Sequence, residues 1–191
     1  MRAFYIFYYY LAYPIFKLFC PCSFSGRENI PDGSLIVCAN HTALMDPILI
    51  ALAFGTKHQL FFMAKAESFK HPFWNIIFNT AGVFPVRRGE TDIKSIRTAM
   101  RHLKDGEQIM IFPEGQRVGE NDSVAAKNGA VRLATKMNVP ILPVFLTKNK
   151  RTFRFSKMVI GKPYKPETPA DKNFDRLSEE LMRKIYELEP K

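Results

Sequence analysis

The sequence predicts an α/β fold in which a mostly parallel or mixed central sheet is flanked by helices. Short apolar runs alternate along the chain with segments that repeat apolar residues at helical spacing, a pattern typical of strand–helix–strand units. Several of these runs end in polar or charged residues, as expected where strands deliver functional groups to one edge of a sheet. A length of 191 residues, 47% of them hydrophobic, suits one core and hardly two. We therefore expect one main domain, over residues 26–191, behind an unusual N-terminal segment.

That N-terminal segment is the strongest compositional anomaly. Residues 1–22 carry five of the seven tyrosines and only two charges. A helix that spans a bilayer needs about 20 apolar residues, whereas Pro14 and Lys17 interrupt this run and tyrosine favours the headgroup region. We expect residues 1–25 to form an aromatic helix that lies in the membrane interface rather than crossing the bilayer. An aromatic helix packed on the protein's own core is the alternative.

Five apolar runs predict the strands of the sheet. The clearest follows Pro31–Gly33, where turn residues precede a continuous apolar stretch. The predicted strands lie within residues 34–39, 58–65, 81–89, 106–115 and 139–147, and the fourth of these stretches ends in a turn that holds a carboxylate.

Helical periodicity marks four further segments, over residues 47–54, 91–106, 123–138 and 174–189. Asp46 and Pro47 form a typical helix start, because aspartate caps free amides and proline fits the first helical position. Thr91 is a candidate cap and Gly106 a stop for the second helix. The last helix carries apolar residues on one face, at Phe174, Leu177, Leu181, Ile185 and Leu188.

The charge balance limits the classes of binding partner that we expect. With 28 Lys and Arg against 18 Asp and Glu, the formal net charge of +10 should attract nucleic acid, anionic lipid headgroups or phosphorylated small molecules. The aromatic residues gather near the N-terminus with few interleaved cations, which argues against a stacking platform for nucleic acid. Cys20, Cys22 and Cys38 have no spacing typical of a zinc site. We expect reduced thiols, a cytosolic compartment and no metal.

His41 and Asp46 stand five positions apart across the turn from the strand at 34–39 to the next helix. A carboxylate bound to one ring nitrogen of a histidine fixes the tautomer, so that the other nitrogen can take a proton from a hydroxyl. The alternative is a turn histidine followed by an ordinary helix cap. Neither a GxSxG segment nor a comparable serine or cysteine elbow accompanies the pair. A catalytic pair here would therefore activate a hydroxyl of the substrate.

Other polar residues follow the remaining predicted strands. Arg87 and Arg88 can clamp a phosphate bidentately, or they are solvated surface charges. Glu114 sits in a tight turn beside Gly115, where a carboxylate on its own is more often structural than functional. Lys65 ends the strand at 58–65. Parallel strands would bring His41, Lys65, Arg88 and Glu114 to one edge of the sheet.

Four stretches, in order, resemble the blocks of the glycerolipid acyltransferases that acylate lysophosphatidic acid, the 1-acylglycerol-3-phosphate O-acyltransferases of the bacterial plsC type. They read NHTALMD (40–46), GVFPVRRG (82–89), FPEGQR (112–117) and VPILPV (139–144). The resemblance covers roughly residues 34–146, and the aromatic N-terminal segment fits the membrane-anchoring element of the family.

The resemblance implies a role for each matched position. His41 would be the general base and Asp46 its orienting carboxylate. Substrate binding would fall to Lys65, Arg87, Arg88, Glu114, Gly115 and Arg117, of which Arg88 would bind the glycerol phosphate. Pro143 matches the fourth block, on the acyl-donor side or in a structural role.

The resemblance also implies a reaction and its partners. The substrate hydroxyl would attack the thioester of acyl-CoA or of acyl-carrier protein, without an acyl-enzyme, a cofactor or a metal. Phosphatidic acid would form at the cytoplasmic face of the cell membrane, with the enzyme bound peripherally or monotopically to the bilayer and no nucleic-acid partner. Another acceptor, such as glycerol-3-phosphate or another lysolipid, and a non-catalytic basic protein of the membrane surface are the alternatives.

Overall fold

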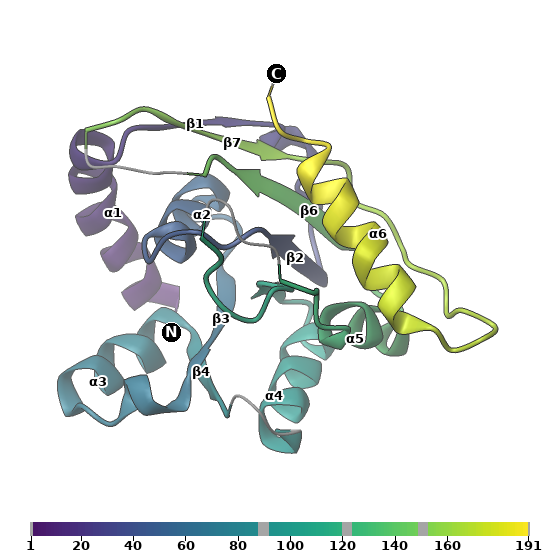
Figure 1. Cartoon of the computed structure of the whole chain (residues 1–191). Coiled ribbons are helices and arrows are strands. Elements are labelled where there is room, and N and C mark those ends of the chain that lie inside the picture. Colours follow the sequence, from purple (N-terminus) through teal and green to yellow (C-terminus); the bar gives the residue numbers. More distant parts are fainter. Residues whose placement is uncertain (1, 88–91, 120–123, 149–152, 191) are drawn as a thin grey trace.

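The chain folds around a seven-stranded mixed sheet with helices against both faces (Figure 1). The computed structural model describes residues 2–87, 92–119, 124–148 and 153–190. Its strands, in the order β1-β7-β6-β2-β5-β3-β4 across the sheet, are β1 (Cys22–Ser25), β2 (Leu35–Ala39), β3 (Leu60–Lys65), β4 (Val83–Val86), β5 (Gln108–Ile111), β6 (Ile141–Leu146) and β7 (Ser156–Ile160). The predicted fold class is confirmed.

Helices fill most connections between the strands. The α-helices are α1 (Arg2–Phe19), α2 (Asp46–Phe54), α3 (Pro72–Ala81), α4 (Ile93–Lys104), α5 (Gly129–Met137) and α6 (Phe174–Tyr186), and the short 3₁₀ helices are η1 (Arg27–Asn29) and η2 (Ala66–Phe69). Their succession turns β2, β3, β4, β5 and β6 into strand–helix–strand units, as the sequence pattern predicts.

Five neighbouring strands run in one direction, and this positions the candidate site. The pairs β6–β2, β2–β5, β5–β3 and β3–β4 are parallel, whereas β7 runs antiparallel to β6 and carries β1 beside it. The carboxyl ends of the five parallel strands therefore meet at one edge, where ligands bind in open α/β sheets.

The core lies in two layers, one on each face of the sheet. Ile36 and Cys38 of β2 pack in the cluster formed with α4, α5 and α6, while Leu35, Val37 and Ala39 pack in the cluster formed with α2. In Figure 1 these two sets of helices lie on opposite sides of the strands. A strand that is covered on both faces must be apolar throughout, which explains the continuous run at 34–39.

The sequence misplaced one helix start and two caps, one of them Asp46, because the N-cap position of α2 belongs to Met45. The helix predicted over 123–138 begins only at Gly129, because Lys127 N donates to Pro113 O at 2.8 Å and ties the preceding segment to another loop instead of a helical turn. The N-cap of α4 is Asp92, whose side chain accepts from Lys94 N and Ser95 N. Thr91, the predicted cap, lies outside the described residues, as does Arg88.

The sequence also missed one α-helix and two strands, besides the two short 3₁₀ helices. The helix α3 begins at Pro72, a recognisable signal, and ends before Gly82, which adopts a φ of 86°. The strands β1 and β7, of which β1 lies at the edge of the sheet, are short. The strand β1 falls within residues 1–25, the range that the sequence assigned to the membrane interface, and it pairs with β7 in the sheet.

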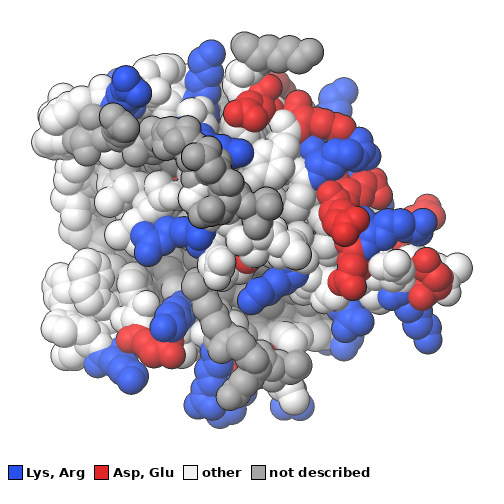
Figure 2. Space-filling view, in the orientation of Figure 1, with Lys and Arg blue, Asp and Glu red and all other residues white. Residues whose placement is uncertain are grey.

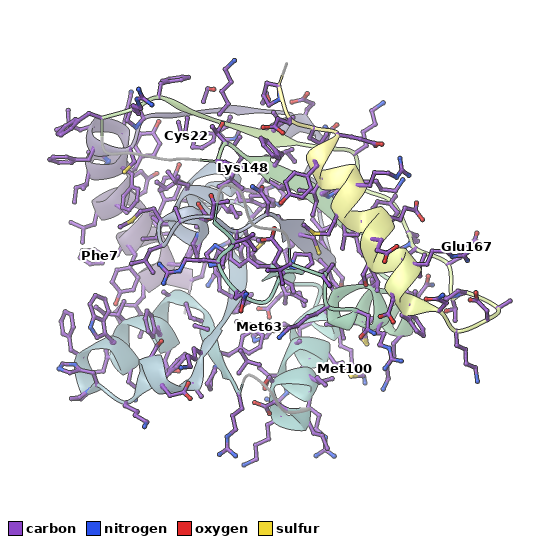
Figure 3. All side chains as sticks on the ribbon, in the orientation of Figure 1. Phe7, Cys22, Met63, Met100, Lys148 and Glu167 are labelled. Carbon is purple, nitrogen blue, oxygen red and sulfur yellow. The ribbon has the colours of Figure 1, made fainter. Side chains whose placement is uncertain are left out.

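The aromatic helix α1 both packs on the body and exposes an apolar face. Tyr5 is 5% exposed and donates a hydrogen bond to Gly55 O at 3.0 Å, and the hydroxyls of Tyr8 and Thr80 lie 2.9 Å apart. The opposite face leaves five large side chains in solvent, at Phe4, Phe7, Leu11, Ile15 and Leu18. Phe7 lies on the outer side of the helix (Figure 3). Among the residues that the structure describes, no helix is long and apolar enough to cross a bilayer.

Candidate active site

His41 and Asp46 meet at the carboxyl end of β2. His41 Nδ1 lies 3.0 Å from Asp46 Oδ2, and the same oxygen accepts the backbone N–H groups of Thr42 and Ala43 at 2.8 Å each. The N-cap position of α2 belongs to Met45, whose side chain makes no capping bond. The carboxylate of the fully buried Asp46 therefore turns back to the loop before the helix, which closes around it.

The geometry fixes which ring nitrogen of His41 can act as a base. An ionised carboxylate can only accept hydrogen bonds, so Nδ1 carries the proton of the neutral ring and Nε2 keeps its lone pair. The ring stacks on Phe112, with centroids 4.0 Å apart and planes 17° apart, and its side chain is 12% exposed. A ring held this firmly presents Nε2 in one direction, where it can take a proton from a hydroxyl.

Glu114 joins the loop after β5 to the loop after β2. Its Oε2 accepts the backbone N–H of His41 at 2.7 Å, and its Oε1 accepts the hydroxyl of Tyr186 at 3.0 Å. A second link runs from Val118 N to His41 O at 2.8 Å. Burial raises the pKa of Glu114, whereas the hydrogen bonds from His41 and Tyr186 lower it in part. The carboxylate thus faces the main chain of the catalytic candidate rather than open solvent.

Gly115 allows the turn that carries Glu114. Its φ is 67°, and a Cβ at this position would lie 2.9 Å from the side chain of Lys127. The left-handed backbone disfavours any larger residue, whereas the flexible end of Lys127 could move aside. The turn closes with a bond from Gly115 N to Phe112 O at 3.0 Å.

Sequence reasoning missed the function of Asn40. This fully buried side chain donates from Nδ2 to Leu146 O and accepts from Leu146 N at Oδ1, both at 2.8 Å. Its amide continues the pairing of β2 with β6 beyond the last ladder bond. The fourth block also lies in β6, where Pro143 stands beside Cys38 in the register. The signal that could have identified Asn40 in the sequence is a polar residue at the end of an apolar run.

The basic candidates follow other strands or loops of the same edge. Lys65 ends β3, two strands from β2, and its Nζ lies 3.8 Å from Glu67 Oε2. Arg87 follows β4, and its backbone N–H donates to Asp92 Oδ2 at 2.9 Å. Arg117 is exposed and precedes Val118 on the loop that holds His41. The structure thus brings together His41, Asp46, Glu114 and Gly115, with exposed cations around them.

Lys148 is a cation at this edge that the sequence did not indicate. It follows β6, and its ammonium lies 4.8 Å from the ring centroid of Tyr186 on α6 (Figure 3). A hollow of about 390 Å³ opens beside Glu114 and is lined in part by Val118, Lys148, Glu179, Met182 and Tyr186. No group of three His, Cys, Asp or Glu side chains within the described parts of the chain is arranged to hold a metal ion.

Known proteins resemble the chain over this region. The sequence profile of the acyltransferase family matches residues 22–147. The 1-acyl-sn-glycerol-3-phosphate acyltransferase of Bacillus subtilis is 30% identical over 176 residues, covering 87% of this chain and 87% of that protein. Its namesake in Borreliella burgdorferi is 34% identical over 137 residues, covering 68% of this chain and 52% of that protein.

A solved structure resembles the whole fold. The crystal structure of the 1-acyl-sn-glycerophosphate (LPA) acyltransferase PlsC from Thermotoga maritima superposes with a TM-score of 0.71 at 28% identity, covering 98% of this chain and 79% of that one. The profile match includes all four sequence blocks, together with β2 and the loops that hold His41 and Glu114. On the profile match and the identity to the Bacillus protein, the chain is an enzyme of the acyltransferase family.

Proposed function

We propose that the enzyme transfers an acyl chain from an acyl thioester to the free hydroxyl of 1-acylglycerol-3-phosphate and so forms phosphatidic acid. The observation that carries the proposal is the His41–Asp46 pair, whose geometry leaves Nε2 of the histidine as a base at the edge of the sheet. The names of the relatives, which are 1-acyl-sn-glycerol-3-phosphate acyltransferases, support the choice of acceptor.

The reaction needs one proton transfer in each direction. His41 Nε2 takes the proton of the acceptor hydroxyl as its oxygen attacks the thioester carbonyl. The carbon–sulfur bond then breaks, and the imidazolium returns the proton to the leaving thiolate. Asp46 stabilises the charged ring meanwhile, as a carboxylate does in other histidine-dependent transfers. The loops at 40–46 and 112–118 contain neither serine nor cysteine, which supports direct attack by the substrate without an acyl-enzyme.

The cations around the pair suit the phosphate of the acceptor. Lys65, Arg87 and Arg117 are exposed along the edge where His41 lies, and Arg88 follows Arg87 in the sequence. Guanidinium groups bind phosphate oxygens in pairs and lysine binds them as a point charge. Glu114 and Gly115 would act by shaping the turn beside this site.

The exposed apolar face of α1 supports membrane attachment. In the space-filling view the side of the molecule formed by α1 and α3 is largely uncharged, whereas acidic side chains gather over α6 (Figure 2). Phe73, Trp74 and Ile76 of α3 are 59%, 49% and 64% exposed, and α3 packs beside α1. Aromatic and aliphatic side chains on one face favour insertion into the lipid interface. We place the enzyme on the cytoplasmic face of the membrane, where either acyl-CoA or acyl-carrier protein would be the donor.

An acceptor panel tests the reaction. Purified protein in detergent is given one acyl thioester, as acyl-CoA or as acyl-carrier protein, with lysophosphatidic acid, glycerol-3-phosphate or a neutral lysolipid. Thiol release and lipid product are followed together. Phosphatidic acid formed from lysophosphatidic acid, at a higher kcat/KM than any other product, supports the proposal. A preference for another acceptor would contradict the proposed substrate but would leave the proposed acyl-transfer reaction intact.

A pair of matched variants tests whether the exposed apolar face of α1 binds the membrane. Phe7→Glu places a charge on the exposed face of α1, while Ile96→Glu makes the same change on α4, which packs on the other face of the sheet. We expect Phe7→Glu alone to lose co-sedimentation with anionic vesicles, since a buried charge is costly in the interface. Equal binding by the two variants would contradict this surface.

A further inference from the structure

The C-terminal helix reaches the catalytic loop through a hydrogen bond. Tyr186, the last residue of α6, donates its hydroxyl to Glu114 Oε1 at 3.0 Å. The other oxygen of that carboxylate accepts the backbone N–H of His41 at 2.7 Å. Glu114 is only 2% exposed, so few water molecules can replace either donor. A continuous chain of contacts thus runs from α6 to the main chain of the proposed base.

The ring of Tyr186 is held in place by contacts that do not involve its hydroxyl. Phe145 of β6 meets it edge-on with centroids 6.2 Å apart, and the ammonium of Lys148 lies 4.8 Å from its centroid. Burial raises the pKa of Tyr186 above its usual value, so the hydroxyl keeps its proton and can donate. Removal of the hydroxyl alone would therefore leave the ring packing intact.

We infer that Tyr186 is a positioning residue of the acyl-transfer site, which acts through Glu114 to hold the backbone of His41 and thereby the direction of its ring. The inference rests on the proposed function of His41. Tyr186 lies outside the region matched by the family profile, residues 22–147, and 72 positions from Glu114 in the sequence. The C-terminal helix is then part of the catalytic apparatus as well as a cover for the sheet.

The hydrogen bond matters because Glu114 has to remain a carboxylate. Burial works against its charge, and the two donors work for it. Without Tyr186 one buried oxygen loses its partner, and Glu114 takes up a proton at a higher pH than in the wild type. The titratable groups that face Glu114 or line the adjoining hollow are His41, Asp46, Lys148, Glu179 and Tyr186.

The test compares Tyr186→Phe with Tyr164→Phe. Tyr164 packs against the same core cluster, also under a lysine ammonium, that of Lys184 at 4.9 Å, and burial raises its pKa too. Its backbone pairs with Ile141 rather than with the site. Each variant loses one half-buried phenolic hydroxyl and keeps its ring, so a general loss of stability should affect both alike.

The first readout follows the backbone of His41 directly. With ¹⁵N-histidine the chain, which has four histidines, gives a spectrum in which His41→Gln identifies the His41 amide. An amide bonded to a carboxylate oxygen reports the titration of that carboxylate. In Tyr186→Phe we expect the midpoint of this titration to rise by about one pH unit, and in Tyr164→Phe we expect the wild-type midpoint. An unchanged midpoint in Tyr186→Phe overturns the inference.

The second readout is acyl transfer at pH 7. We expect kcat to fall about tenfold in Tyr186→Phe, with the KM of the thioester unchanged, and to remain at the wild-type value in Tyr164→Phe. Equal losses in the two variants would show a structural effect and contradict the inference. If the wild-type protein acylates no acceptor, the proposed function fails, and the amide titration still decides whether Tyr186 governs the Glu114–His41 link.

Discussion

Asp46→Asn removes the charge beside His41 while keeping the shape of the side chain. In the folded protein Asp46 Oδ2 accepts from His41 Nδ1 at 3.0 Å and from two backbone N–H groups at 2.8 Å. The amide oxygen of asparagine can accept the same three bonds. What disappears is the negative charge that stabilises the imidazolium formed during the transfer.

The size of the effect follows from the distance. At an effective dielectric constant of about 20, two unit charges separated by the observed 3.0 Å attract by about 5.5 kcal/mol, or about four powers of ten in rate. The dipole of the asparagine amide retains part of this attraction to the imidazolium, so we expect kcat to fall by about 10²- to 10⁴-fold. The two backbone bonds weaken from charged to neutral acceptors, which costs about 1 kcal/mol of stability each.

Steady-state acyl transfer with saturating thioester measures the loss of kcat, and thermal unfolding verifies that the Asp46→Asn protein is folded. Asp92→Asn is the matched control, because Asp92 also accepts backbone N–H groups at the start of a helix, from Lys94 and Ser95, but does not face the histidine. We expect this control to keep the wild-type kcat. A folded Asp46→Asn protein that retains more than about a tenth of the wild-type kcat would refute the electrostatic role.

Three further substitutions probe the support of the site. Asn40→Ala leaves the buried N–H and C=O of Leu146 without their partner, so the free energy of unfolding in urea should fall by about 2–5 kcal/mol, and a loss below about 1 kcal/mol would contradict this. Asp92 has a pKa of about 2 in the fold against 3.8 ordinarily, because Ser95 and the Arg87 N–H donate to it. It therefore stabilises the fold above pH 3.8 and loses this effect as the pH falls towards 2. The melting-temperature advantage over Asp92→Asn should thus vanish in acid, and a constant gap would contradict the assignment. Gly115→Ala forces a Cβ onto a backbone with a φ of 67°, so the melting temperature should fall by a few degrees and the KM of the acceptor should rise. Wild-type values for both would show that the turn tolerates a Cβ.

The sheet and its functional edge could be predicted because both depend on local patterns. Buried strands such as β2 are apolar throughout, and parallel strands necessarily bring their carboxyl ends together. From this alone, His41 and Glu114 could be expected at one edge, and the structure joins them through a 2.7 Å hydrogen bond. The spacing of His41 and Asp46 left a catalytic pair and a cap both open. The carboxylate of Asp46 points back towards the loop before the helix, and only the three-dimensional structure shows this direction.

The contacts that the sequence missed join residues far apart in the chain. Tyr186 meets Glu114 across 72 positions, and Asn40 meets Leu146 across 106. Hydrophobic periodicity does not reveal such pairs. The apolar face of the last helix predicted only which of its residues pack in the core. The N-terminal helix shows a related limit, because composition detects an excess of aromatic residues but not which of them, such as Tyr5, turn inward.

The most direct measurement compares acyl transfer by His41→Ala and His102→Ala. His102 offers a matched control, since its Nδ1 bonds a carboxylate five positions later, Glu107, and its ring also stacks on a phenylalanine, Phe61. It lies in the last turn of α4 rather than after a strand, and so lies away from the catalytic edge. If His41 is the base, His41→Ala should fold and bind vesicles but release no thiol above background, while His102→Ala keeps its turnover. Comparable turnover in both folded variants would contradict general-base catalysis by His41.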